Sequence, residues 1–532
     1  MESHRPRNDG HARIVSLPRF FNRIADATLP VLGTIDRAAL EQQLHDVAVA
    51  LQAVPAVTDR PEQAEGFLLA ANLAARLYPR LTLLGPSSLT ERAATLVLSV
   101  NPDCDLLDAP AANAVQLVWG AQVSDGSGVG VSAAGWNVAV DGRQPDRLGP
   151  ASPPAALAAA AVGIGELFRI VFAPHLGDRG RIGPVASSWN VLTETAWSDE
   201  APIPELGLPV GRVHLAGAGA IGQAATMTLL ASAVQGTLVP VDQEPLELSN
   251  LQRYVLAYDA DVGQAKTALI QRAASDTLLE VEPVTGRWGT KASSTDARVV
   301  LTALDTPEDR IAVQAALPER IYNAYTQPAD LGWSRHERFG KLPCLACLYW
   351  PNRPRPHRHE QIGAALGQHP LRVLLYLLSP QLLVGQPLPP ALVANRPDLP
   401  PKASRWAEVP LLQDLAAARS LADADIAAWS NASIETLYRE GVCGGALLAI
   451  TTADTAVIVP LAHQSTLAGI MLAVQLIAAS SDLLHRYRPA TIEGRYDVLR
   501  APSSPHSSPR RPTPGCLCSD PDFVRRYRQR WA

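Results

Sequence analysis

Three glycines and one acid form the clearest chemical pattern in the chain. They surround two apolar runs, 212–216 and 237–241, and comprise Gly217, Gly219, Gly222 and Asp242. Glycines let a backbone approach a phosphate closely, and the first turn of a following helix presents free N–H groups to it. Asp242 stands about twenty residues after the last glycine, where an acid can accept hydrogen bonds from a ribose. The pattern predicts a nucleotide site, although NAD and FAD enzymes use similar turns.

A set of polar and basic residues follows Asp242. Asn250, Arg253 and Lys266 could together donate to several phosphate oxygens. A dehydrogenase has no use for such a set beyond its ribose acid, whereas a site that cleaves ATP needs fixed donors and cations. Each residue alone could be an ordinary surface residue on a loop, but the set favours ATP.

The segment 242–266 resembles the ThiF/MoeB superfamily of adenylating enzymes, which includes the ubiquitin-activating enzymes. The shared features are an acid after the second strand, a Ser-Asn-Leu-x-Arg run at 249–253 and a Gly-x-x-Lys helix start at 263–266. The resemblance implies that ATP and Mg²⁺ bind here. The glycines and Asp242 would hold the nucleotide, and Asn250, Arg253 and Lys266 would hold and polarise its phosphates.

Asp305 directly follows another apolar run, 299–304. This is the carboxyl end of an expected strand, where open α/β sheets bind ligands. The resemblance implies that Asp305 holds Mg²⁺, which favours carboxylates together with phosphate oxygens. It also implies a position for Arg310 near the phosphates or the carrier tail. The alternatives are a helix N-cap for Asp305 and a surface position for Arg310.

Six cysteines in 532 residues are too few for a disulfide scaffold and favour a reducing cytoplasm. The resemblance implies a structural zinc site made of two pairs, Cys344 with Cys347 and Cys516 with Cys518, because four thiolates suit tetrahedral Zn²⁺. The second pair has one intervening residue where the family has two. Unliganded thiols are the alternative, and we expect Cys104 to be structural.

Cys443 lies between glycines in the run 438–446. The resemblance implies a crossover loop here, whose cysteine takes the activated carboxylate as a thioester. The reactive form would be a thiolate with a lowered pKa. The alternative is a small buried cysteine beside the next helix.

Residues 1–208 have no comparable motif but have the pattern of an α/β domain. We expect helices at 63–77 and 155–172, strands at 81–84, 95–100 and 115–119, and a hairpin or bulged strand within 128–141. The resemblance to ubiquitin-activating enzymes implies a degenerate copy of the adenylation fold, paired with the active copy. An unrelated accessory domain is the alternative.

Arg23 lies in a run, 19–24, that is similar to the first helix of the family. In the family the corresponding arginine reaches into the partner's ATP site and neutralises phosphate charge. A salt-bridged surface arginine is the alternative.

The length of the chain predicts two or three domains. We expect a degenerate adenylation-like domain at 1–208 and an active, Rossmann-like adenylation domain at 209–350. A mostly helical insertion with the catalytic-cysteine region would occupy 351–440. The crossover loop, the return to the core and the second zinc knuckle would occupy 441–532.

Composition argues against nucleic-acid or membrane partners, because the net charge is only −5 and shows no strong blocks. Polar residues interrupt the longest apolar stretch, 460–479, which favours a buried helix over a membrane span. The N-terminus lacks the apolar core of a signal peptide, so we expect a cytoplasmic protein. We expect the arginine-rich end, 525–530, to be a solvated tail.

These patterns predict an ATP-dependent enzyme that activates a ubiquitin-like, β-grasp carrier. It would adenylate the C-terminal glycine of the carrier, form a thioester at Cys443 and pass the carrier to a conjugating enzyme. We expect a bacterial conjugation system, such as those linked to antiphage defence, and a homodimer is compatible with it. The alternatives are a sulfur-carrier adenylyltransferase without a thioester step, an NAD-binding oxidoreductase and a non-catalytic scaffold.

Overall fold

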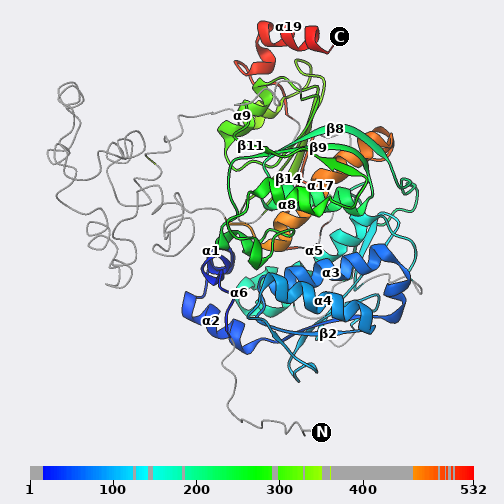
Figure 1. Ribbon diagram of the computed structural model, residues 1–532, viewed down its shortest axis with the longest axis vertical. Coiled ribbons are helices and arrows are strands. Elements are labelled where there is room, and N and C mark those ends of the chain that lie inside the picture. The colour runs from blue at the N-terminus through cyan, green and yellow to red at the C-terminus, as the bar shows by residue number, and fades with distance from the viewer. Residues whose placement is uncertain are drawn as a thin grey trace, which may run out of the picture.

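Two β-sheets with helices packed against them lie one above the other, one from each half of the chain (Figure 1). The computed structural model describes residues 16–123, 127–141, 148–181, 186–289, 297–327, 330–349, 360, 459–488, 492–497, 499–500, 502, 505–506 and 510–531. The expected helical insertion lies outside these residues, except for residue 360.

The described part of the N-terminal half forms a sheet of seven strands in the order β3-β2-β1-β4-β5-β6-β7. The strands are β1 (Val49–Ala53), β2 (Arg80–Leu84), β3 (Asp105–Leu106), β4 (Val115–Trp119), β5 (Gly128–Ala134), β6 (Asn137–Val140) and β7 (Ser187–Asn190). The first five are parallel, while β6 and β7 run antiparallel to their neighbours. The β5–β6 pair is the hairpin expected within 128–141.

The described part of the C-terminal half forms a second sheet, in the order β10-β9-β8-β12-β13-β14-β15, with β11 also paired to β9. Its strands are β8 (Pro209–Ala216), β9 (Gln235–Asp242), β10 (Leu279–Val281), β11 (Val284–Thr285), β12 (Val299–Thr302), β13 (Arg320–Thr326), β14 (Asp330–His336) and β15 (Glu493–Asp497). Here too, β14 and β15 are antiparallel to their neighbours and the preceding strands are parallel.

The two sheets therefore share one topology. If the strands are numbered from one to seven along each half, leaving out β11, both sheets have the strand order 3-2-1-4-5-6-7. The predicted fold class is confirmed: a Rossmann-like α/β half is paired with an N-terminal α/β half of the same design.

Helices cover both sheets. They are α1 (Phe21–Leu32), α2 (Arg37–Asp46), α3 (Pro61–Ala75), α4 (Ser87–Val100), α5 (Pro153–Val171), α6 (Ala173–Leu176), α7 (Ala220–Ala231), α8 (Lys266–Ala273), α9 (Pro307–Ala315), α10 (Leu345–Tyr349), α17 (Ala462–Ser480), α18 (Leu483–Tyr487) and α19 (Pro521–Arg530). The short 3₁₀ helices include η1 (Pro55–Asp59), η2 (Gly177–Arg179), η3 (Leu248–Gln252), η4 (Asp259–Asp261) and η8 (Leu517–Ser519).

The predicted strand at 95–100 is wrong, because these residues end α4. The buried positions of α4 are Leu89, Ala93, Val97 and Val100, a spacing of three or four residues that lines one face of a helix. The apolar run 95–100 is too short by itself to reveal this period.

Helices α5 and α17 occupy the same place in the two halves, between the sixth and seventh strands of each sheet, and they pack against each other. Both are long and apolar enough to cross a membrane, but 94% of each apolar window is buried inside the protein. Gly469 lets α17 approach α7, because a Cβ there would lie 2.5 Å from the Cβ of Ala224. The stretch expected to form a buried helix is thus part of the core.

Protein side chains fill the N-terminal half where a nucleotide site would be expected. Trp119 ends β4, is fully buried and donates from Nε1 to Gln63 Oε1 at 2.9 Å. A Cβ on Gly66 of α3 would lie 2.5 Å from the Trp119 ring. After β1, Pro55 opens a 3₁₀ helix in place of a glycine turn. The described part of this half therefore keeps the topology without a phosphate turn.

Candidate nucleotide site and cysteine cluster

The glycine turn connects β8 to α7 at the carboxyl edge of the second sheet. Gly217 has φ +97°, a left-handed conformation that favours glycine, and a Cβ there would lie 2.5 Å from the carbonyl oxygen of Ala303. A Cβ on Gly222 would lie 2.2 Å from the Gly217 carbonyl oxygen. Because these two glycines have no side chain, the backbone after β12 and the first turn of α7 can lie directly against the glycine turn. The first N–H groups of α7 then face a compact loop.

Asp242 holds this turn in place. Its Oδ2 accepts a hydrogen bond from the Ala218 N–H at 2.9 Å, and its Oδ1 accepts one from the Glu244 N–H at 2.9 Å. Burial raises the pKa of Asp242, while the positive charge of Lys266 acts in the opposite direction. Both carboxylate oxygens are therefore already engaged by backbone amides.

Glu244 is a site residue that the sequence interpretation missed. Its side chain is 51% exposed, and its Oε2 accepts from Lys266 Nζ at 2.6 Å. An acid two residues after Asp242 was the available signal. Glu244 offers this site a carboxylate that is open to solvent.

Tyr254, also missed, joins the two cations to the glycine turn. Lys266 Nζ lies 5.3 Å and Arg253 Cζ 5.4 Å from the centre of its ring. Its hydroxyl would lie 3.3 Å from a Cβ on Gly219. The structure thus brings the predicted Arg253 and Lys266 together beside the turn.

Lys266 is a buried charge at the start of α8, only 5% exposed. Burial alone would lower its pKa, but Tyr254, Asp242 and Glu244 outweigh burial and raise the pKa above the ordinary value. The amine therefore remains a cation at neutral pH.

Asn250 and Arg253 lie on and just after η3. Asn250 is buried and its Oδ1 accepts from the Glu247 N–H at 3.1 Å, which fixes the start of η3. Arg253 Nη1 is buried without a hydrogen-bond partner in the part of the chain that the structure describes. A buried guanidinium nitrogen of this kind can donate a hydrogen bond to an incoming anion.

Asp305 is exposed and follows Ala303 and Leu304, which come after β12 and contact the glycine turn. It is not the N-cap of α9, because that position belongs to Thr306, whose Oγ1 accepts from the Asp309 N–H at 3.1 Å. The Asp305 carboxylate is accessible at the edge of the sheet where the turn lies.

Arg310 is a buried arginine whose guanidinium already has several protein acceptors. It donates to Asn323 Oδ1 at 2.5 Å, to the Tyr349 hydroxyl at 2.8 Å, and to the carbonyls of Ala324 and Leu304. These acceptors occupy the guanidinium, so Arg310 ties β13 and α10 to the end of β12 and is not a surface residue.

Arg23 lies on α1, which packs against η3 of the other half. Its Nη1 is 3.6 Å from Asp26 Oδ2. Burial raises the pKa of Asp26 to about 6, while the charges of Arg23, Arg37 and Arg253 act to lower it. The carboxylate of Asp26, in the N-terminal half, therefore experiences the charges of both Arg23 and Arg253, which belong to different halves.

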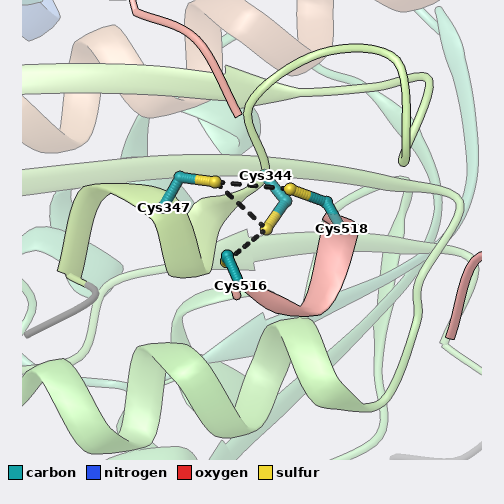
Figure 2. A group of neighbouring side chains, drawn as sticks. All are labelled: Cys344, Cys347, Cys516 and Cys518. Atoms are coloured by element: carbon teal, nitrogen blue, oxygen red, sulfur yellow. Dashed lines mark hydrogen bonds between the residues drawn. The ribbon is translucent and has the colours of Figure 1, made fainter. Parts of the chain in front are cut away.

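Four cysteines form a cluster, and Figure 2 shows their sulfur atoms facing one another. The sulfur distances are 3.9 Å for Cys344–Cys347, 3.6 Å for Cys344–Cys516 and 3.3 Å for Cys347–Cys518. All four residues are buried, and the sulfurs lie within 4.8 Å of one another. Four thiols converge from α10, from η8 and from the residue just before each of them, and they fit the donor set of Zn²⁺. The short spacing of the second pair does not prevent this.

Residues 208–496 match the ThiF family. The chain belongs to the ThiF family. It is 32% identical to an uncharacterised protein, y4jF of Sinorhizobium fredii, over 97% of this chain and 98% of that protein.

Two solved structures are also similar to this ThiF-family chain. PaaA, as its selenomethionine protein, is 21% identical with a TM-score of 0.20 and covers 23% of this chain and 40% of its own. Escherichia coli MccB with MccA-N7isoASN is 14% identical with a TM-score of 0.32 and covers 58% of this chain and 66% of its own.

Membership of the ThiF family supports a nucleotide-binding, adenylating enzyme that uses ATP and Mg²⁺. The glycine turn and the two cations are compatible with that chemistry. Cys443, the predicted nucleophile of this ThiF-family chain, lies outside the described residues. Cys104 is buried, and burial raises its pKa to about 12, so it is a protonated thiol at neutral pH.

The C-terminal end of this chain is a helix and not a loose tail, although Arg525, Arg526 and Arg528 on it are exposed to solvent, as expected. Helix α19 packs at the end of α9, where Tyr527 donates to the Glu319 carbonyl at 2.9 Å and Arg530 to the Ala316 carbonyl at 2.8 Å. Trp531 Nε1 donates to the Leu317 carbonyl at 2.8 Å. The carbonyls at and just after the end of α9 need donors, and the C-terminal residues of the chain supply them.

Proposed function

We propose that this chain adenylates the C-terminal glycine of a small, ubiquitin-like β-grasp protein. The observation that carries the proposal is the pair of cations, Arg253 and Lys266, that flank Tyr254 next to the glycine turn. A triphosphate needs such cations and a dinucleotide does not, so the pair favours ATP over NAD.

In the proposed reaction, a carboxylate oxygen of the carrier attacks the α-phosphorus of ATP. The bond from that phosphorus to the pyrophosphate oxygen breaks, and pyrophosphate leaves. Lys266 would exchange its Glu244 partner for phosphate oxygens, and Arg253 would gain the acceptor that its buried Nη1 lacks. Asn250 would donate to the same phosphates.

The remaining roles follow the layout of the same edge of the sheet. Asp242 would support the nucleotide through the turn that it holds, and Glu244 would accept from the ribose because its carboxylate is exposed. Asp305 would hold Mg²⁺ on the phosphates. Arg23 would act as a finger from the N-terminal half when pyrophosphate leaves. Arg310 has no role with the phosphates in this proposal.

The second proposed stage uses Cys443. Its thiolate would attack the carbonyl carbon of the acyl adenylate, AMP would leave, and the carrier would be held as a thioester. A conjugating-enzyme cysteine would then take the carrier. The support is the position of Cys443 between glycines in a chain of this family. Zn²⁺ on Cys344, Cys347, Cys516 and Cys518 would be structural.

The test combines pyrophosphate exchange with adduct formation, using small proteins that end in glycine from neighbouring reading frames. We expect carrier-dependent exchange of labelled pyrophosphate into ATP, and a carrier adduct that a thiol reductant removes. Cys443→Ala should keep the exchange and lose the adduct, whereas the control Cys104→Ala should keep both.

Other outcomes would favour the alternatives. Exchange without an adduct in the unmodified protein would identify a sulfur-carrier adenylyltransferase. NAD binding with no exchange would indicate an oxidoreductase, and neither activity would indicate a scaffold.

A further inference from the structure

A buried arginine of the N-terminal half contacts the cation-bearing segment of the other half. Arg76 follows the last residue of α3 and is 1% exposed. Its Nη1 donates to the carbonyl of Leu251, and its Nη2 donates to the carbonyl of Ala257 at 3.1 Å. These two carbonyls bracket Arg253 and Tyr254 in the chain.

Asn72, one helical turn earlier on α3, completes the contact. Its Oδ1 accepts from Arg76 Nε at 2.8 Å, and its Nδ2 donates to the carbonyl of Val255 at 3.0 Å. Two side chains of one half thus hold three carbonyls of residues 251–257 in the other half. We call Arg76 and Asn72 the carbonyl clamp.

Arg76 contributes a buried positive charge to the carbonyl clamp. No ion pair is recorded for Arg76 within the described ranges, so its guanidinium is solvated by amide and peptide oxygens. Burial lowers the pKa of Arg76 to about 9, which leaves it charged at neutral pH. The planar fork of arginine presents donors from separate nitrogen atoms in fixed directions, whereas lysine donates from a single ammonium nitrogen.

The held segment has little regular structure of its own. Between η3 and η4, residues 253–258 form turns and irregular backbone. Within it, Arg253 and Tyr254 must stay aligned with Lys266, which lies on α8. Displacement of catalytic groups by about 1 Å can reduce a rate by about a hundredfold, so an external anchor for this segment has a direct chemical consequence.

We propose that Arg76, together with Asn72, is a positioning residue for adenylation. It acts from the half without a glycine turn and fixes residues 251–257, so that Arg253 and Tyr254 keep their places beside the phosphates. The proposal rests on the proposed function, because it assigns a partner to the same ATP site. In this proposal the N-terminal half contributes to every adenylation turnover by holding residues 251–257 in place.

Arg76→Met in the full-length protein tests the clamp. We expect binding of a non-hydrolysable ATP analogue with Mg²⁺, measured by calorimetry, to weaken by about tenfold or more. In pyrophosphate exchange the KM for ATP should rise more than kcat falls. Arg76→Lys should recover part of the affinity, because it keeps the charge but contacts fewer carbonyls.

Arg181→Met is the matched control. Arg181 is equally buried in the N-terminal half, but it pairs with Asp141 and Glu166 of that half. Its loss should lower thermal stability and leave the nucleotide affinity of the folded protein unchanged. If Arg181→Met weakened nucleotide binding as much as Arg76→Met, the positioning role would be overturned in favour of general destabilisation.

Binding of the nucleotide separates this proposal from the proposed function. If the unmodified protein bound no ATP analogue, the proposed function would fail together with the clamp. If it bound the analogue and a folded Arg76→Met protein bound it equally well, only the clamp would be rejected. If Arg76→Met did not fold, Asn72→Ala would decide, with an expected loss of a few-fold in affinity that an unchanged value would contradict.

Discussion

Lys266 shows at the residue level how a buried charge can be kept ready for a ligand. Its Nζ is held by a carboxylate that is itself half in solvent, Glu244. An anion that reaches Nζ can replace this partner, since Glu244 can then be solvated by water. The cost of exchanging partners is therefore small compared with separating a fully buried pair.

We predict that Lys266→Met lowers ATP–pyrophosphate exchange by about a hundredfold or more, because the phosphates lose a fixed cation in a site of low dielectric constant. Thermal stability should change little, because Glu244 remains exposed. Arg212→Ala, which breaks an exposed ion pair with Glu282 on the same sheet, is the control and should keep full exchange. Unchanged exchange in Lys266→Met would revive the scaffold alternative.

His463 makes stability depend on pH. It lies in the first turn of α17, and its Nε2 has no hydrogen-bond partner among the described residues. Burial lowers its pKa from 6.5 to about 4. The unfolded chain therefore binds a proton more readily, so this contribution to stability is complete above pH 6.5 and is lost as the pH falls towards 4.

We predict that the free energy of unfolding falls by about 2 kcal/mol from this residue alone between pH 7 and pH 5. His463→Gln should remove that part of the pH dependence. Urea unfolding of both proteins at the two pH values measures the difference. Parallel pH dependence in the two proteins would show that His463 does not titrate in this range.

Helix α19 shows at the element level how a chain end completes a remote site. Arg530 and the following Trp531 donate to the carbonyls after α9, and η8, just before α19, carries Cys518 and directly follows Cys516. The cysteine cluster is thus closed by elements that are about 170 residues apart in sequence. A metal bound there would tie the chain end to the sheet.

We predict that the purified protein holds about one zinc ion per chain and that Cys518→Ser loses it. Chelation should lower the midpoint of thermal unfolding by several degrees, since binding energy at a structural site is folding energy. Metal analysis and a thermal scan measure both effects. Cys104→Ser should retain the metal, and unmodified protein without zinc would contradict the assignment.

Buried polar contacts join the two halves into one molecule. Glu194, fully buried after β7, accepts from Trp333 Nε1 at 3.0 Å and from the Tyr496 hydroxyl at 2.5 Å, and it pairs with Arg488. Burial raises the pKa of Glu194, while the charge of Arg488 acts in the opposite direction. This network and the clamp are on different elements, so the halves are fixed to each other at more than one place.

We predict that Glu194→Ala destabilises the protein by about 3–5 kcal/mol, because Arg488 would remain buried without its carboxylate. Glu194→Gln should cost less, since the amide can still accept hydrogen bonds. Urea unfolding followed by fluorescence measures both. Equal stability of all three proteins would mean that this network does not hold the halves together.

Local sequence determined the strand–turn–helix unit and its chemistry. The spacing of Gly217, Gly222 and Asp242 predicts β8, α7 and β9, because a phosphate turn is built from neighbouring residues. The cysteine pairs were visible for the same reason. The strand wrongly expected at 95–100 shows the limit of short windows, where a helix and a buried strand look alike.

Tertiary structure alone decided which distant groups share the site. The burial of Arg310, the place of Tyr254 between two cations and the grip of Arg76 on residues 251–257 depend on how elements pack. Arg76 and its carbonyl acceptors are about 180 residues apart, so no local propensity encodes their contact. Only the close packing of two similar halves brings a buried guanidinium to these carbonyls.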